Sequence, residues 1–183
     1  MVKKLLKSLS KKSYESDDHI LRMVEYSDLL GRKIGLDADQ LIELWLLANF
    51  HDIGEITISK DILVKPEKLT QEEWKKIKKH PKEGYNIINS VSDFSFAADK
   101  VLYHHEHWDG NGYPEGVKGK KIPLLSRIIA IVDAYEVMIN ERPYSPAKSK
   151  QEALSELKKH AGSQFDPELV EVFVDMIKKL KIK

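Results

Sequence analysis

The sequence contains no cysteine. This absence excludes disulfide bonds, thiolate zinc sites and cysteine nucleophiles, so any metal ion has to be bound by histidine and carboxylate side chains. The sequence also lacks an apolar run close to the roughly 20 residues that span a bilayer. Near its start, the apolar pair Leu5-Leu6 is too short for the hydrophobic part of a secretory signal. We therefore expect a cytoplasmic protein that does not insert into a membrane.

Neither sign of charge dominates, because Lys and Arg total 30 and Asp and Glu total 29. A chain without an overall positive field has no general attraction for a nucleic-acid polymer or an anionic membrane surface. The length of 183 residues suits one domain with a sizeable core. We interpret residues 1–14 as a basic N-terminal segment and residues 15–183 as that domain. The sequence leaves open whether a sensor domain precedes it.

Apolar residues recur mainly at helical spacing, and no alternating pattern long enough for a strand is present, which predicts an all-α fold. Trp45 is expected on the buried face of the second helix, and Gly54 is expected to end that helix. The segment 124–139 is apolar on nearly all sides, which predicts a central position. The predicted helices cover residues 15–34, 37–51, 59–63, 82–90, 97–105 and 124–139, and three more begin at the capping residues Thr70, Ser149 and Asp166.

The most informative single residue is Asp133, which lies in the apolar helix predicted at 124–139. An unpaired carboxylate in such a helix is costly to bury, so Asp133 requires a cation. That cation could be a metal ion, or it could be the guanidinium of Arg127 or Arg142. Exposure of Asp133 on a narrow polar stripe is a further alternative.

Two adjacent pairs add potential metal ligands. His51-Asp52 ends the second predicted helix, where neighbouring side chains can reach neighbouring ions. His104-His105 falls in the predicted helix 97–105, where consecutive side chains diverge by about 100° and therefore suit two different ions. Either pair could instead consist of ordinary surface residues.

Three more potential ligands have ordinary alternatives. Glu15 and His19 are four residues apart and share one helical face, so both could reach the same ion, or they could form a plain polar face. His80 follows a run of lysines, which also fits a solvated helix end. Taken together, these positions form a nitrogen and oxygen donor set that suits iron, manganese or zinc better than magnesium or calcium. Two such ions about 3.5–4 Å apart can supply a hydroxide nucleophile and neutralise the leaving oxygen of a phosphate ester.

From about Glu15 onward the chain resembles the HD-GYP family of bacterial cyclic di-GMP phosphodiesterases, a branch of the HD-domain metal phosphohydrolases. The resemblance is carried by motifs in a fixed order: His51-Asp52-Ile53-Gly54, Lys65-Pro66, Leu69-Thr70, His80-Pro81, His104-His105-Glu106, Asp109-Gly110-Asn111-Gly112-Tyr113-Pro114, Ile122-Pro123, Asp133-Ala134-Tyr135, Arg142-Pro143-Tyr144 and Phe165-Asp166-Pro167.

The resemblance implies a compact multi-helix fold around a central site with two or three divalent ions, iron or manganese first and zinc as the alternative. Asp52 would bridge two ions and take the catalytic position, and Glu15 would allow a third ion. Arg142 would contact a substrate phosphate, and Tyr113 would border the pocket or simply pack its loop. The implied metal ligands are Glu15, His19, His51, Asp52, His80, His104, His105 and Asp133.

The implied activity is hydrolysis of cyclic di-GMP to linear pGpG, and on to GMP, by metal-bound hydroxide. Three residues depart from the family pattern: Glu55 stands where lysine is usual, Ser145 where a basic residue is usual, and Glu136 where aspartate is common. The first two weaken a phosphate-binding surface. They keep two alternatives open, another nucleotide substrate or a non-catalytic signalling module that acts through a partner protein or as a homodimer.

Overall fold

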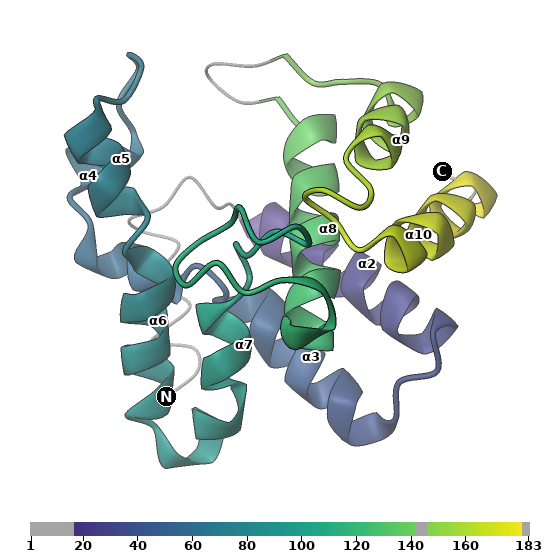
Figure 1. Ribbon diagram of the computed structural model, residues 1–183, viewed down its shortest axis with the longest axis horizontal. Coiled ribbons are helices and arrows are strands. Elements are labelled where there is room, and N and C mark those ends of the chain that lie inside the picture. The colour runs from purple at the N-terminus through teal and green to yellow at the C-terminus, as the bar shows by residue number, and fades with distance from the viewer. Residues whose placement is uncertain (1–16, 142–145, 181–183) are drawn as a thin grey trace.

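The computed structural model describes residues 17–141 and 146–180, which form helices joined by turns and loops (Figure 1). These residues contain no β-strand, only an isolated bridge between Ala161 and Phe165, so the predicted all-α fold is confirmed. None of their helices combines the length and the hydrophobicity needed to cross a membrane. The α-helices are α2 (Asp17–Lys33), α3 (Ala38–Phe50), α4 (Lys60–Leu63), α5 (Gln71–Ile77), α6 (His80–Asn89), α7 (Ala98–Leu102), α8 (Leu124–Ile139), α9 (Lys150–Lys159) and α10 (Pro167–Lys179). Three 3-10 helices lie between them, η1 (Ile53–Thr57), η2 (Ser92–Ala97) and η3 (Gly119–Lys121).

Helix α8 runs through the middle of the molecule, and α2, α3, α9 and α10 pack around it (Figure 1). Its bounds and its central position agree with the prediction for residues 124–139. Ile128, Ile131 and Val132 are fully buried, and the buried ring of Tyr135 meets Tyr26 of α2 edge-on. Burial of apolar side chains of this size stabilises a fold by about 1.5–3 kcal/mol each. The core therefore surrounds α8 on several sides.

Capping residues determine where several helices begin. Asp37 caps α3 by accepting a hydrogen bond from the backbone of Gln40. The capping boxes predicted from Thr70 and Ser149 are both present, at α5 and α9. Such caps bond to backbone N–H groups that have no partner inside the helix, so they fix the first turn in place.

Two predicted helix boundaries are wrong. Helix α6 begins at His80 rather than at residue 82, because Pro81 needs no backbone donor and fits the first turn. Helix α7 ends at Leu102, and His104 and His105 lie in the turn that follows it. The apolar spacing of residues 97–105 could not distinguish a short helix followed by a turn from one longer helix.

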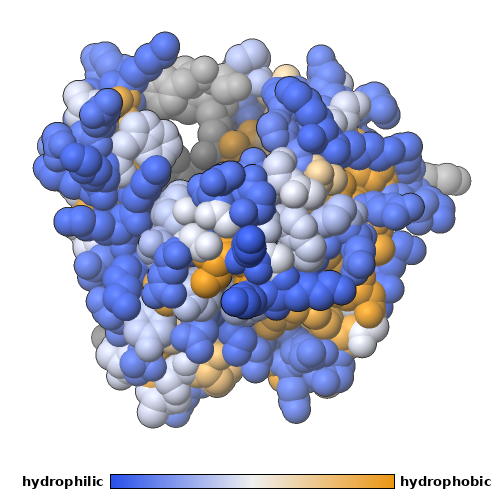
Figure 2. All heavy atoms as spheres, viewed as in Figure 1, coloured by the Kyte–Doolittle hydropathy of each residue, from blue (hydrophilic) through white to orange (hydrophobic). Residues whose placement is uncertain are grey.

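The face shown in Figure 2 is mostly hydrophilic, with hydrophobic surface gathered mainly on the side of the C-terminal helices. Trp45 is 44% exposed, so its predicted place on the buried face of α3 is wrong. Leu44, Leu47 and Ala48 form that buried face instead. The spacing of apolar residues in α3 did not determine whether Trp45 lies on the buried face. Packing of α3 against α2 and α8 determines which face is buried.

The buried residue Asp166 ties α10 to α8. One carboxylate oxygen accepts hydrogen bonds from the backbone of Glu168 and Leu169 and so caps α10. The other accepts a hydrogen bond of 2.5 Å from Arg127 Nη1 on α8, and Arg127 Nε donates to the carbonyl of Ile122. Arg127 is therefore committed to Asp166, which argues against its predicted alternative role as the partner of Asp133.

We expect Asp166→Ala to lower the free energy of unfolding by about 3–5 kcal/mol, because it leaves a buried guanidinium without its carboxylate. The exposed cap Ser149 is the matched control, and Ser149→Ala should cost only about 1 kcal/mol. Urea unfolding of both variants measures the difference. Equal and small losses would show that the Asp166–Arg127 pair does not hold α10 in place.

Candidate metal centre

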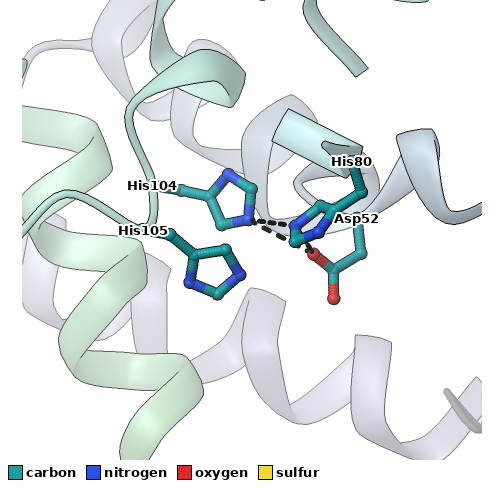
Figure 3. A group of neighbouring side chains, drawn as sticks. All are labelled: Asp52, His80, His104 and His105. Atoms are coloured by element: carbon teal, nitrogen blue, oxygen red, sulfur yellow. Dashed lines mark hydrogen bonds and ion pairs between the residues drawn. The ribbon is translucent and has the colours of Figure 1, made fainter. Parts of the chain in front are cut away.

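The structure brings seven of the eight predicted metal ligands into two neighbouring groups. Within each group, one potential ligand atom from every residue lies within 4.8 Å of the others. The first group consists of Asp52, His80, His104 and His105 (Figure 3), and the second consists of His19, His51 and Asp133. The eighth predicted ligand, Glu15, lies outside the described residues, as do the predicted phosphate contact Arg142 and the variant position Ser145.

The first group converges on one carboxylate oxygen. Asp52 Oδ1 lies 3.0 Å from His80 Nε2 and 3.2 Å from His104 Nε2, and these two nitrogens are 3.1 Å apart. The ring of His105 stands beside them, with its centroid 4.1 Å from that of His104. Asp52 is partly accessible, whereas His80 and His104 are each only 2% exposed.

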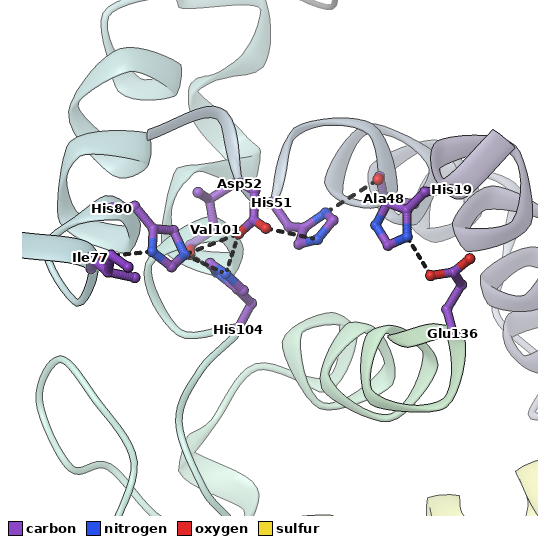
Figure 4. A network of polar contacts seen from close by, with 9 residues as sticks. All are labelled: His19, Ala48, His51, Asp52, Ile77, His80, Val101, His104 and Glu136. Carbon is purple, nitrogen blue, oxygen red and sulfur yellow. Dashed lines mark hydrogen bonds and ion pairs between the residues drawn. The ribbon is translucent and has the colours of Figure 1, made fainter. Parts of the chain in front are cut away.

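Helix ends orient three histidines of the two groups. In each case, ring atom Nδ1 lies within hydrogen-bond distance of the backbone carbonyl three residues earlier (Figure 4). That carbonyl is at the end of a helix, where carbonyls lack a hydrogen-bond partner inside the helix. Because a carbonyl oxygen can only accept, Nδ1 is the protonated nitrogen and Nε2 presents a lone pair. The three contacts are His51 to Ala48 at 3.3 Å, His80 to Ile77 at 2.9 Å and His104 to Val101 at 2.6 Å.

The donor atoms of the first group fit a divalent cation. Two imidazole lone pairs and one carboxylate oxygen meet within 3.2 Å of one another, and such acceptors repel unless a positive charge lies among them. Neutral imidazole and ionised carboxylate are the forms in which histidine and aspartate bind metals.

The electrostatics of the group favour these protonation states. Burial alone would raise the pKa of Asp52, but its interactions with His51, His80 and His104 hold it well below its usual value. Burial lowers the pKa of His104 and lowers that of His105 further, and the neighbouring histidines also lower both. Asp52 is therefore expected to be anionic near neutral pH, and His104 and His105 are expected to be neutral.

His51 connects the two groups. Its Nε2 lies 3.6 Å from Asp52 Oδ2, and its ring centroid is 5.5 Å from that of His104 and 6.2 Å from that of His19. Figure 4 shows His51 between Asp52 and His19. Asp52 thus turns one oxygen toward each group, which is the arrangement expected of a bridging carboxylate.

Glu136 supports the second group, and the sequence reasoning recorded it only as a departure from the family pattern. It is 2% exposed, and its Oε2 lies 2.5 Å from His19 Nδ1 (Figure 4). Its Oε1 accepts hydrogen bonds from Arg22 Nε and Asn140 Nδ2, each at 2.7 Å. A carboxylate bonded to Nδ1 fixes both the orientation and the tautomer of a histidine ring. One available signal was that Glu136 follows Asp133 by three residues and so shares its helical face.

Two glycines allow the Asp52 turn to approach α6. A Cβ atom on Gly54 would stand 2.0 Å from the carbonyl oxygen of His80 and 2.6 Å from the backbone nitrogen of Gly84. Gly54 lies inside η1 and does not end α3, so its predicted role as a helix stop is wrong. The glycine is required because backbone meets backbone there, which brings Asp52 beside His80.

The position of His104 and His105 also corrects the sequence analysis. They follow α7 in a turn instead of lying on a helix, and both belong to the Asp52 group. The prediction that the two rings serve different ions is therefore not supported by their geometry. In the turn, the two ring centroids are 4.1 Å apart. On a helix, consecutive side chains would point about 100° away from each other.

The loop formed by residues 109–116 folds back over His104 and His105. The backbone nitrogen of Tyr113 donates to the carbonyl of His105 at 3.1 Å, and the two rings lie 4.9 Å apart. Glu106 Oε1 accepts hydrogen bonds from the backbone nitrogens of Glu115 and Gly116 and holds the far end of the loop. Tyr113 is therefore held against the site.

The phenol of Tyr113 stays protonated. Burial and the nearby charges of Asp52, Asp133 and Glu55 raise its pKa above the ordinary value of a tyrosine. A protonated phenol is a hydrogen-bond donor, so Tyr113 can offer its O–H group to an anion at the site. Glu55 contributes to this shift, which indicates that its charge acts at the same edge of the site.

A family model described as "HD domain" matches residues 1–169, which is most of the sequence. The chain belongs to the HD-domain family. It is 34% identical over 182 residues to a protein named "Cyclic di-GMP phosphodiesterase" from Thermotoga maritima, with 98% of this chain and 50% of the relative covered. It is 36% identical over 165 residues to "3'3'-cGAMP-specific phosphodiesterase 3" from Vibrio cholerae, with 88% of this chain and 35% of the relative covered. This HD-domain chain thus spans half or less of the length of these curated relatives.

The expected HD-GYP resemblance is confirmed by these relatives. The fold of the HD domain also matches a crystal structure of a cyclic GMP-AMP specific phosphodiesterase from V. cholerae, with a TM-score of 0.74 at 20% identity. The match covers 97% of this chain and 47% of that one. At this identity the likeness shows a shared fold.

We expect Gly54→Ala to lower the free energy of unfolding by about 2 kcal/mol or more, because the new methyl group meets backbone atoms that cannot turn away. Gly84→Ala is the control, since its methyl group would meet a side-chain atom, Val101 Cγ1, at 2.8 Å. The added substitution Val101→Ala should remove that clash from Gly84→Ala and should not help Gly54→Ala. Thermal unfolding of the four proteins checks this, and relief of both clashes by Val101→Ala would contradict it.

Proposed function

We propose that this HD domain is a metal-dependent phosphodiesterase that hydrolyses cyclic di-GMP to linear pGpG and then to GMP. The observation that carries the proposal is the meeting of Asp52 with the lone pairs of His80 and His104, an arrangement suited to a divalent cation. The names of relatives such as the Thermotoga protein support the substrate class. Because those relatives are about twice as long as this chain or longer, the activity is proposed for the domain it contains.

The proposed centre holds two or three divalent ions, with iron or manganese preferred and zinc as the alternative. Asp52 is proposed as the ligand that would bridge the ions and as the residue closest to the reaction, because its Oδ1 lies in the first group and its Oδ2 lies 3.6 Å from His51 Nε2 of the second. Glu15 is proposed as a ligand of a third ion on the strength of the sequence pattern. Bound divalent ions would act as Lewis acids on a phosphate oxygen and provide a nucleophile at neutral pH. The other proposed ligands are His19, His51, His80, His104, His105 and Asp133.

The chain's own residues have three tasks in this proposal. The helix ends before His51, His80 and His104 hold the imidazoles in position before substrate arrives, so little reorganisation is needed during the reaction. Tyr113 donates its phenol hydrogen to a phosphate oxygen. Arg142 is proposed to contact the phosphate through its guanidinium fork, which suits paired hydrogen bonds to phosphate oxygens.

A second candidate substrate is another cyclic dinucleotide, such as 3'3'-cGAMP. The Vibrio relative that is named for that specificity is 36% identical to this chain, and the Thermotoga protein is 34% identical. Glu55 adds a reason, because a negative charge at the edge of the site would alter which ligand is accepted. A non-catalytic signalling module, paired with another protein or with a second copy of the chain, remains the alternative from a different class.

We further propose that residues 15–183 form the catalytic domain, that residues 1–14 are a basic segment attached to it, and that the protein works in the cytoplasm. These three points rest on the sequence pattern.

We expect purified protein to contain two or three divalent ions per chain and to cleave cyclic di-GMP with manganese or with ferrous iron loaded under anaerobic conditions. His80→Ala and Asp52→Asn should each lower turnover by at least about 100-fold, because each removes a proposed direct metal ligand. Removing a direct ligand lowers activity more than removing a residue that only hydrogen-bonds to a ligand. Elemental analysis and product chromatography give both quantities, with 3'3'-cGAMP assayed in parallel.

His160→Ala is the control, since His160 pairs with Glu156 at a partly exposed position outside both groups. Its metal content and rate should equal those of the wild type. Retention of metal and rate by His80→Ala would refute the site. Tight nucleotide binding by metal-loaded protein without product would favour the signalling module instead.

We expect Glu136→Gln to weaken the second ion's binding by about 10-fold, because the amide keeps the shape of the side chain but loses the charge that orients His19. Binding to the Asp52 group should be unchanged. Manganese titration against a chelator, which resolves the two steps, measures the effect. Equal weakening of both steps would contradict the assignment of Glu136 to one group.

A further inference from the structure

The segment from α5 to α6 carries several lysines, and their surroundings in the structure differ. Lys75 pairs with Glu72 at 2.7 Å, and the ammonium of Lys82 lies over the ring of Tyr85. Lys76 and Lys79 line a groove on the side of η1 and α4, next to Glu83. Lys78 differs from these lysines, because it faces the loop that borders the metal centre.

Lys78 belongs to a layered arrangement that leads away from the Asp52 group. The ring of His105 is followed by the ring of Tyr113 at 4.9 Å, and Lys78 Nζ lies 5.3 Å from the centre of the Tyr113 ring. This is within the range of a cation–π contact, which holds the ammonium group at the ring. The Lys78 side chain is exposed, and among the described residues no carboxylate lies within 4.0 Å of its Nζ. Its charge is therefore available to an anionic ligand.

The charge of a cyclic dinucleotide explains why such a cation is useful. The molecule carries two phosphodiester groups, and only one of them can be at the metal centre during cleavage. The other keeps its negative charge and therefore needs a cation of its own. A flexible lysine is a suitable point charge for that phosphate.

We propose that Lys78 binds the phosphate of a cyclic dinucleotide that is not being hydrolysed, with Tyr113 between this lysine and the metal centre. The proposal rests on the proposed function and adds a residue that selects substrates with two phosphates. Lys78 contacts the ligand equally before and during the reaction, so it contributes to binding and leaves the chemical step unchanged.

The test compares Lys78→Met with Lys79→Met, a neighbouring exposed lysine that lines the groove on the other side. The substrates are cyclic di-GMP, which has two phosphates, and bis(p-nitrophenyl) phosphate, which has one. For Lys78→Met we expect KM for cyclic di-GMP to rise about tenfold, the size of one lost hydrogen bond to a charged group. We expect kcat for cyclic di-GMP, and both constants for the single-phosphate substrate, to stay unchanged. Lys78→Arg should restore KM, and Lys79→Met should have no effect.

Equilibrium titration with cyclic di-GMP and with 3'3'-cGAMP gives a readout that does not depend on turnover. A tenfold weaker dissociation constant in Lys78→Met alone supports the proposal even if cyclic di-GMP is not cleaved, in which case only the proposed activity fails. An unchanged KM and dissociation constant in Lys78→Met overturns the proposal while leaving the activity intact. Equal losses with both substrates also overturn it, because they place Lys78 at the phosphate being cleaved. A wild-type protein that neither binds nor cleaves a cyclic dinucleotide overturns both proposals.

Discussion

The structure depends on a hydrogen bond made three times, from a histidine Nδ1–H to a carbonyl at the end of a helix. The contacts of His51, His80 and His104 each use a carbonyl that a helix end leaves without an internal partner. They determine which ring nitrogen carries the proton, and so they turn two Nε2 lone pairs onto Asp52. The ends of α3, α5 and α7 thereby orient these three rings and select their tautomers, as Glu136 does for His19.

The rest of the fold brings these helix ends together. The backbone contact between Gly54 and His80 places the Asp52 turn against α6, and Glu136 on the central helix α8 orients His19 from α2. Residues 117 positions apart in the sequence thus meet at one hydrogen bond. The loop that carries Tyr113 covers the site from another direction through its contact with His105. Each of these neighbours constrains a different side chain of the candidate metal centre, so the site is a property of the whole domain.

Local sequence signals predicted much of this. The apolar run predicted α8 with its observed bounds, because burial on several sides makes the segment apolar over most of its length, and the capping boxes at Thr70 and Ser149 predicted two helix starts. The motifs also identified the residues that form the two groups. Features that depend on distant contacts were missed: Gly54 looked like a helix stop because its clash is with His80, 26 positions away. Helical spacing also predicted a helix that continued through His105, because periodicity does not reveal that the carbonyl of Val101 binds the side chain of His104.

The central claim is that histidines with protonated Nδ1 present their Nε2 lone pairs to a cation beside Asp52. Nitrogen-15 NMR of the histidine rings during zinc titration tests it most directly, because the spectrum reports the protonation and metal binding of each ring nitrogen. The account predicts protonated Nδ1 in His80 and His104 before zinc is added and a large shift of their Nε2 signals upon binding, with His160 unchanged. Protonated Nε2 in His80 and His104, or Nε2 signals that do not respond to zinc, would contradict it.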